Sequence, residues 1–207
     1  MSRLILAMII GGGACVFMAV QDMRLRSMAD EKPQSISCAD LQANGPGDNL
    51  HITMQDFLLC EFAYVYEKQA GGNWSNVWVP AVPVGGEFHK LLLSQVDQDG
   101  NFVGEFQLPS DVNVIVQAKD VENESELQQL AAQESLQGMV INLISSLGST
   151  EKELLKESYP SVDFDNCYIL EVGRTPASAG KLLGFGVGGL ALMVAGGATF
   201  LARRRTA

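Results

Sequence analysis

Apolar residues gather in two long runs at the ends of the chain, and between them apolar and polar residues are mixed. The first run covers residues 4–20, and the second covers residues 182–202 and stops at three consecutive arginines. A helix needs about 20 consecutive apolar residues to cross the hydrocarbon core of a bilayer. The pattern therefore predicts an N-terminal and a C-terminal transmembrane helix.

A cleaved signal peptide is the alternative interpretation of the first run. Ser27 and Ala29 provide the small residues that a signal peptidase requires. Arg24 and Arg26 separate this site from the apolar run, however, where cationic residues are disfavoured. We therefore expect a signal-anchor, a first helix that stays on the mature chain.

Basic residues beside the two runs bear on sidedness. Arg3 precedes the first run and residues 203–205 follow the second, and arginines at the end of a span are typical of its cytoplasmic side. Five basic residues on the domain side nearly balance them: Arg24, Arg26, Lys32, Arg174 and Lys181. We expect an integral, two-pass membrane protein that has the lipid bilayer as a partner, with cytoplasmic termini and an extracytoplasmic domain.

Small residues recur at four-residue spacing in both runs. They are Ala7, Gly11 and Cys15 in the first run and Gly184 and Gly188 in the second. Small residues allow helix backbones to approach closely in lipid, although glycine and alanine are also common in such helices for other reasons. We expect these five to be helix-packing residues, either within the chain or in self-association through the spans.

The middle of the chain predicts one domain of ordinary size. The expected divisions are transmembrane helix 1 over 1–21, a juxtamembrane linker over 22–36, a globular domain over 37–177, transmembrane helix 2 over 178–202 and a basic tail over 203–207. Strand patterns come early and helical patterns come late, which is typical of an α+β domain rich in β-hairpins. The predicted fold class is this domain flanked by the two transmembrane helices.

Turn residues divide the expected strands. Two hairpins are predicted, one pairing part of 50–68 with 74–79 across Gly71–Asn73, and one pairing 88–96 with 101–108 across Asp99–Gly100. Pro80 and Pro83 are expected to end the strand that precedes them.

Later segments carry a strand and several helix signals. The expected strands are 112–118 and 167–172, and helices are expected after Asn123, over 140–147 with a buried strand as the alternative, and from Thr150 to Pro160.

Net charge is −10, and most of the acid lies in the middle of the chain. An acidic surface repels nucleic acid and anionic headgroups, so we expect no nucleic-acid partner. The simplest role of the acid is to keep the domain soluble.

Cysteines and histidines give no recognised site. Cys38, Cys60 and Cys167 lack the close pairs of a zinc site, and they are either buried thiols or one disulfide with a thiol left over. His51 and His89 lack a neighbouring nucleophile motif. The sequence therefore predicts no catalytic residue, no metal and no cofactor.

Four aromatic residues on the first predicted hairpin form the most suggestive group: Tyr64, Tyr66, Trp74 and Trp78. Ordinary hairpin packing accounts for such a cluster, but an exposed cluster is a partner-binding surface. The leading hypothesis is a membrane-tethered, non-catalytic interaction or assembly module that binds a protein partner. The alternative is an enzyme or a ligand-binding domain whose site is assembled from distant residues.

Overall fold

The computed structural model describes residues 3–69, 71–94, 112–141, 149–160, 162–164 and 166–205. The chain divides into two compact units. One is Glu31–Thr175, and the other combines Met1–Asp30 with Pro176–Ala207. The first unit contains the strands, and the second contains the two longest helices, α1 (Arg3–Arg26) and α6 (Ala179–Arg205).

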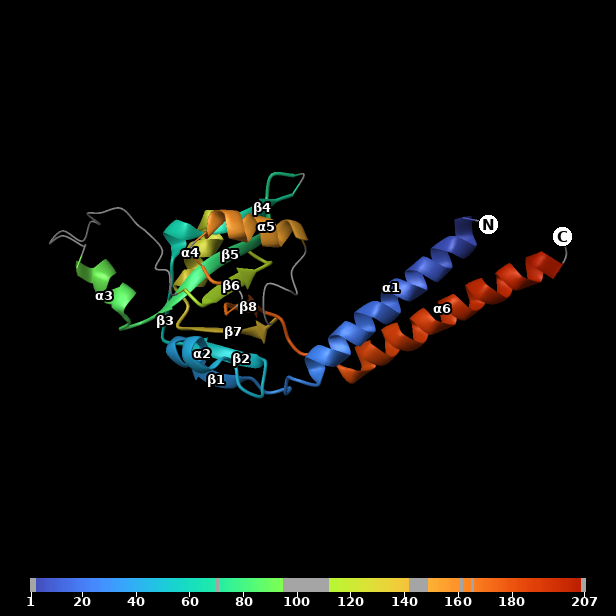
Figure 1. Ribbon diagram of the computed structural model, residues 1–207, viewed down its shortest axis with the longest axis horizontal. Helices are drawn as coiled ribbons and strands as arrows, with labels where there is room; N and C mark the ends of the chain where they lie inside the picture. Colours follow the sequence, from blue (N-terminus) through green and yellow to red (C-terminus); the bar gives the residue numbers. More distant parts are fainter. Residues whose placement is uncertain are drawn as a thin grey trace. The chain divides into compact units, whose positions relative to one another are not determined.

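A mixed sheet of eight strands forms the first unit and bends into a nearly closed, barrel-like shape (Figure 1). The strands are β1 (Gln34–Ser37), β2 (His51–Gln55), β3 (Phe57–Leu59), β4 (Val65–Lys68), β5 (Trp74–Pro83), β6 (Val114–Ala118), β7 (Ser135–Val140) and β8 (Tyr168–Val172). Their order is β1-β2-β7-β8-β6-β5-β3, and β4 pairs with β5. The pairs β1/β2 and β6/β8 are parallel, and the others are antiparallel.

A single residue changes the direction of the chain between β2, near one end of the strand order, and β3, at the other end. Asp56 separates β2 from β3 and has a φ of 54°, in the left-handed region that Asp tolerates better than most residues. The chain thereby leaves its pairing with β7 and pairs next with β5. This bend brings the two ends of the sheet toward closure.

Helices in the same unit connect and cover the strands. They are α2 (Cys38–Asn44), the short 3-10 helix η1 (Glu61–Ala63), α3 (Glu87–Ser94), α4 (Glu124–Ala131) and α5 (Ser149–Ser158). At the start of α4 the Asn123 side chain accepts a hydrogen bond from the Glu126 amide, and Leu127 and Leu130 are buried. The predicted capping of this helix is confirmed.

The core beside α5 joins helix and sheet. Trp78 of β5, Ile115 of β6 and Ile169 of β8 pack there with Leu155 and Tyr159, and all five are buried. The Tyr159 hydroxyl also donates to the Trp78 carbonyl oxygen at 3.2 Å. Burial of these large side chains is the main stabilising contribution in this part of the unit.

The predicted transmembrane helices over 1–21 and 178–202 are not supported. Among the residues that the structure describes, no helix is long and apolar enough to cross a membrane. A span needs about 20 consecutive apolar residues, because it must cross about 30 Å of hydrocarbon. The predicted fold class, the signal-anchor and the two-pass integral membrane localisation are therefore wrong.

Local predictions in the domain have mixed outcomes. The first hairpin is present as β4 and β5, and β6 and β8 are present close to their predicted bounds. The predicted strand over 88–96 is wrong, because Glu87–Ser94 forms α3, whose consecutive leucines are strong helix formers. Residues 101–108 lie outside the described residues, as do 142–148, so the helix predicted over 140–147 is described only at Val140, which ends β7, and at Ile141, whose amide donates to the Ile169 carbonyl oxygen.

Pro80 does not end its strand. Strand β5 continues to Pro83, and the Pro80 carbonyl accepts a hydrogen bond from the Cys60 amide at 2.8 Å. The N–H and C=O of a strand residue point to the same side, so the N–H that proline lacks faces Cys60 and not β6. Pro80 therefore removes no bond from the β5–β6 ladder, which allows it in an interior strand.

Candidate functional site

Three aromatic rings stack on one another at the β4–β5 hairpin. The Tyr66 and Trp74 ring centroids are 4.5 Å apart with an interplanar angle of 26°. Tyr64 completes the group, 5.2 Å from Trp74 and 5.8 Å from Tyr66. All three residues are partly exposed. We call Tyr64, Tyr66 and Trp74 the aromatic stack.

Tyr64 is the extended residue that precedes β4, and alternation along the chain places it on the same side as Tyr66. Val65 lies between them and packs against the buried core that contains Trp78. Successive side chains of a strand point to opposite faces, so Tyr64 and Tyr66 face away from that core. This accounts for two of the three rings.

A β-bulge brings in the third ring. Glu67 pairs with Asn76 while Lys68 pairs with Trp74, so Ser75 is the extra residue in β5. The extra residue reverses the alternation, and Trp74 joins Tyr66 and Lys68 on one face. Beyond the bulge Trp78 pairs with Val65 and is fully buried.

The sequence grouped Tyr64, Tyr66, Trp74 and Trp78 as one partner-binding cluster. The structure brings the first three together and places Trp78 in the core. Trp74 and Trp78 have the same parity along the chain, so alternation alone gives them the same face. No turn residue at this position indicates the bulge at Ser75 from the sequence.

The start of α4 supports the hairpin. The Trp74 amide donates to the Glu122 carbonyl oxygen at 3.2 Å, and the Asn73 side chain donates to the Glu122 carboxylate at 2.8 Å. The stack is thus held from two elements: its own hairpin and the segment that leads into α4.

Acidic residues lie near the Tyr64 end of the stack. Burial raises the pKa of Glu61, and the nearby charge of Glu124 raises it further. Burial likewise raises the pKa of Tyr64, with added contributions from Glu124 and Tyr66. Glu61 and Glu124 therefore lie near each other, and Glu124 also lies near Tyr64. The sequence gives no sign of this, because the two residues are distant along the chain.

One cation of the chain already contacts the stack. The Lys68 ammonium lies over the Tyr66 ring, 5.5 Å from its centroid. This distance is within the range of a cation–π interaction. Lys68 is exposed, so the contact is open to solvent.

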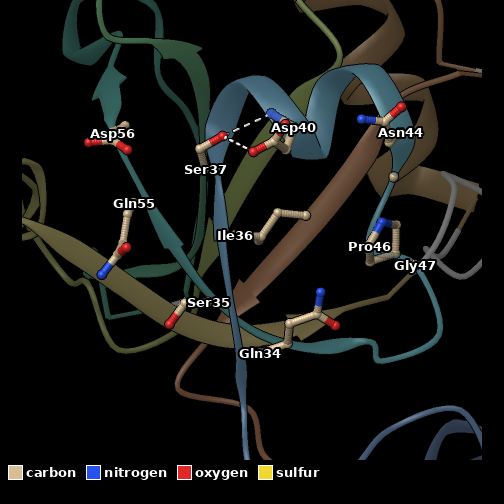
Figure 2. Close-up of a pocket in the computed structure, with 11 residues that line it drawn as sticks. Gln34, Ser35, Ile36, Ser37, Asp40, Asn44, Pro46, Gly47, Gln55 and Asp56 are labelled. Carbon is tan, nitrogen blue, oxygen red and sulfur yellow. Dashed lines mark hydrogen bonds between the residues drawn. The ribbon is translucent and has the colours of Figure 1, made fainter.

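A polar pocket of about 490 Å³ lies alongside β1, at the end of the sheet (Figure 2). Its lining combines β1 with residues of α2, the turn that follows α2 and the end of β2: Gln34, Ser35, Ile36, Ser37, Asp40, Asn44, Gly45, Pro46, Gly47, Gln55 and Asp56. Asp40 is engaged in capping α2, because its amide donates to the Ser37 hydroxyl and that hydroxyl donates to its carboxylate. Both carboxylates of the pocket are exposed, so no charge is buried there.

The histidines lie in unrelated surroundings. His51 is buried on β2, with Nε2 3.1 Å from Nε2 of Gln137. His89 is on α3, and its Nδ1 accepts a hydrogen bond from the Gly85 amide at 2.8 Å. Neither hydrogen bond joins a histidine to a nucleophile or to a carboxylate, as a catalytic triad requires.

Three cysteines are buried thiols. Burial raises the pKa of Cys38, Cys60 and Cys167 to about 12 in each case, and Cys38 also contributes to the shift of Cys60. All three are free, so the structure does not contain the disulfide that was one of the two alternatives from the sequence. A thiol with such a pKa carries almost no thiolate near pH 7 and is a poor nucleophile. Within the described ranges, no group of three or more His, Cys, Asp or Glu side chains is arranged to hold a metal ion.

The helices α1 and α6 touch through two glycines. A Cβ atom placed on Gly12 would lie 2.6 Å from the Gly189 carbonyl oxygen, and one placed on Gly189 would lie 2.8 Å from the Gly12 carbonyl oxygen. Further along the antiparallel pair, a Cβ atom at Gly186 would lie 3.9 Å from that of Ala19. The backbones are in direct contact at Gly12 and Gly189, where no side chain fits.

The helix-packing residues named from the sequence lie beside this contact. Cys15 borders it, with its Cβ 3.0 Å from the Cβ position of Gly189. The other four are exposed: Ala7, Gly11, Gly184 and Gly188. A Cβ atom at any of these three glycines would meet no other atom within 4 Å. The contact between the helices is therefore made by Gly12, which follows Gly11 in α1, and by Gly189, which follows Gly188 in α6.

Comparison with known protein families, with characterised proteins and with solved structures finds no match to this chain.

Proposed function

We propose that this chain is a non-catalytic interaction module that binds a protein partner through the aromatic stack. The observation that carries the proposal is the position of Trp74, which the Ser75 bulge turns away from the core and onto Tyr66. A large apolar ring on that face contributes less to the core than Trp78 does. Its exposed surface is available to a partner.

The composition of the stack supports this role. Tryptophan and tyrosine are enriched among the residues that dominate binding energy in protein interfaces. Stacked rings lose little conformational entropy on binding, because each side chain has only two rotatable bonds and its neighbours already restrict it. A partner that covers the stack gains apolar contact at low entropic cost.

The other surfaces support an enzyme less well. The pocket beside β1 has polar walls without a buried charge, and the three thiols are protonated and enclosed. Catalytic groups are more often found where burial and a specific charged partner shift a pKa inside a cleft. These features favour the interaction module over the alternative hypothesis of an enzyme.

Photo-crosslinking tests the proposal in cells that express the full chain. A photoreactive phenylalanine analogue replaces Tyr66 in one variant and Lys156, an exposed residue of α5, in the control. We expect one protein to be crosslinked from position 66 and not from position 156. Purified partner is then titrated against the wild type and against a variant with Tyr66→Ser and Trp74→Ser.

The titration decides the outcome. We expect the double substitution to weaken binding by about 30-fold or more, as loss of an interface hot spot does. Phe62→Ser is the matched control, because Phe62 is 40% exposed and pairs with Phe88 instead of the stack. Equal binding by the double variant, or no crosslink specific to position 66, would overturn the proposal.

A further inference from the structure

The ring planes of the aromatic stack are closer to parallel than to perpendicular. Interplanar angles within the stack are between 26° and 34°. A face of this kind suits a planar group laid flat on it, whereas walls at right angles would suit a compact, spherical one. Of the two side chains that are permanently cationic near pH 7, arginine has a planar guanidinium that stacks on aromatic faces, whereas the lysine ammonium is compact.

Charge around the stack favours a cation. Glu61 and Glu124 are close enough to affect each other's environment, and the whole chain carries a net charge of −10. An aromatic face attracts a cation through the ring quadrupole, and a carboxylate near it, as Glu124 is near Tyr64, adds direct ion pairing. A second copy of this chain would bring the same negative charge to the interface, so electrostatic repulsion disfavours self-association here.

Lys68 shows that a cation fits at this position. Lys68 pairs directly with Trp74 across the hairpin, and the Lys68 ammonium lies over the Tyr66 ring. Its location over the ring marks where a positive charge is stabilised.

We infer that the partner presents an arginine side chain to the aromatic stack, and that Lys68 occupies the same place in the free protein and is displaced on binding. This inference rests on the proposed function and names the chemistry of its partner. The guanidinium lies on the face of Tyr66 and pairs with Glu124. Lys68 acts as a built-in competitor, since its cation–π contact with Tyr66 must break before the arginine binds.

Fluorescently labelled octa-arginine and octa-lysine peptides test the inference by anisotropy with the full chain. We expect octa-arginine to bind more tightly than octa-lysine, although the two peptides carry the same charge. Trp74→Ser should weaken octa-arginine binding by about 2- to 5-fold, the range of an exposed cation–π contact. Phe62→Ser should leave binding unchanged, because Phe62 lies outside the stack.

A second pair of variants isolates the role of Lys68. Lys68→Ala should strengthen octa-arginine binding by about 2- to 5-fold, because the competing contact is removed. Lys156→Ala makes the same change in net charge at an exposed site on α5, so it reports the general electrostatic effect alone. The Lys68 variant must exceed the Lys156 variant for the inference to stand.

Each result has one interpretation. Equal binding of the two peptides, or binding that Trp74→Ser leaves unchanged, shows general attraction to an acidic protein and overturns the inference. Equal effects of Lys68→Ala and Lys156→Ala overturn the role of Lys68. If the inference fails while the crosslinked partner still depends on Tyr66 and Trp74, the interaction module stands and its partner is not cationic.

Discussion

Trp74 and Trp78 belong to the same strand and have the same parity, yet they face opposite sides of the sheet. Trp78 is fully buried beside Ile115, whereas Trp74 stacks on Tyr66 at 4.5 Å. The difference arises from Ser75, the extra residue that reverses the alternation between them. One residue thus places one tryptophan in the core and the other on the aromatic stack.

The first prediction compares the stability effects of these two tryptophans. Trp78→Ala should lower the free energy of unfolding by about 3–5 kcal/mol, because it leaves a large cavity in the core. Trp74→Ala should cost only about 1 kcal/mol, the value of a partly exposed aromatic contact. Urea unfolding followed by near-ultraviolet circular dichroism measures both. Similar losses in the two variants would contradict the bulge-dependent assignment.

The second prediction concerns the contact between α1 and α6. With Cys15 replaced by Ala, the pair Ala19→Cys and Gly186→Cys should form a disulfide on mild oxidation, since the Cβ separation of 3.9 Å suits the bond. Adding Gly189→Leu should slow this reaction about tenfold, because a side chain there forces the backbones apart.

Gly188→Leu provides the control for that experiment. A Cβ atom at Gly188 meets no neighbouring atom within 4 Å, so its substitution should leave the crosslinking rate unchanged. Non-reducing electrophoresis and intact mass report the product. An equal effect of both substitutions would show that the helices do not pack as described.

The third prediction is a pH dependence from Glu171. Burial alone would raise the pKa of Glu171, but hydrogen bonds and charge from Lys119 and Arg174, each at 2.7 Å, outweigh burial and lower it. A depressed pKa contributes stability above the unfolded value of about 4.3, and the contribution is lost as pH falls through the folded value. Glu171→Gln should therefore cost about 1–2 kcal/mol at pH 7 and progressively less below pH 4.

Urea midpoints at pH 7, 5, 4 and 3 test that dependence. Glu157→Gln, at an exposed position of α5, is the matched control and should show little difference from wild type at any of these values. A gap between wild type and Glu171→Gln that stays constant down to pH 3 would exclude a carboxylate with a lowered pKa.

The fourth prediction concerns the buried thiols. In a Cys15→Ala variant, Cys38, Cys60 and Cys167 should resist a disulfide reagent at pH 8 in the native state, because burial raises the pKa of each to about 12. All three should react together once the protein is unfolded in denaturant. Rapid labelling of one cysteine in native buffer would show that its surroundings open or that its thiolate is stabilised.

Features whose interactions are short in sequence are predictable from the chain alone. The cap of α4 joins Asn123 to Glu126, three residues away, and the turn of the first hairpin lies between strands that are neighbours in sequence. Strand β8 is recognisable from its own run of apolar and β-branched residues. In the cap and the turn the interacting residues are near one another in the chain, and in β8 the strand signal lies within a single run of residues, so each pattern is visible in the sequence.

The features that locate the candidate site required the tertiary structure. The sequence places Tyr64, Tyr66 and Trp74 on one hairpin, but only the pairing of β4 with β5 shows the bulge that unites them. Helix packing shows the same limit, because each residue turns a helix by about 100° and only the partner helix decides which glycine faces it. The sequence thus determined the capped helix, the hairpin and the acidic charge by itself. The face of Trp74 was decided by the register of β4 on β5, and the face of Gly12 and the approach of Glu124 to Tyr64 were decided by contacts between segments far apart in the chain.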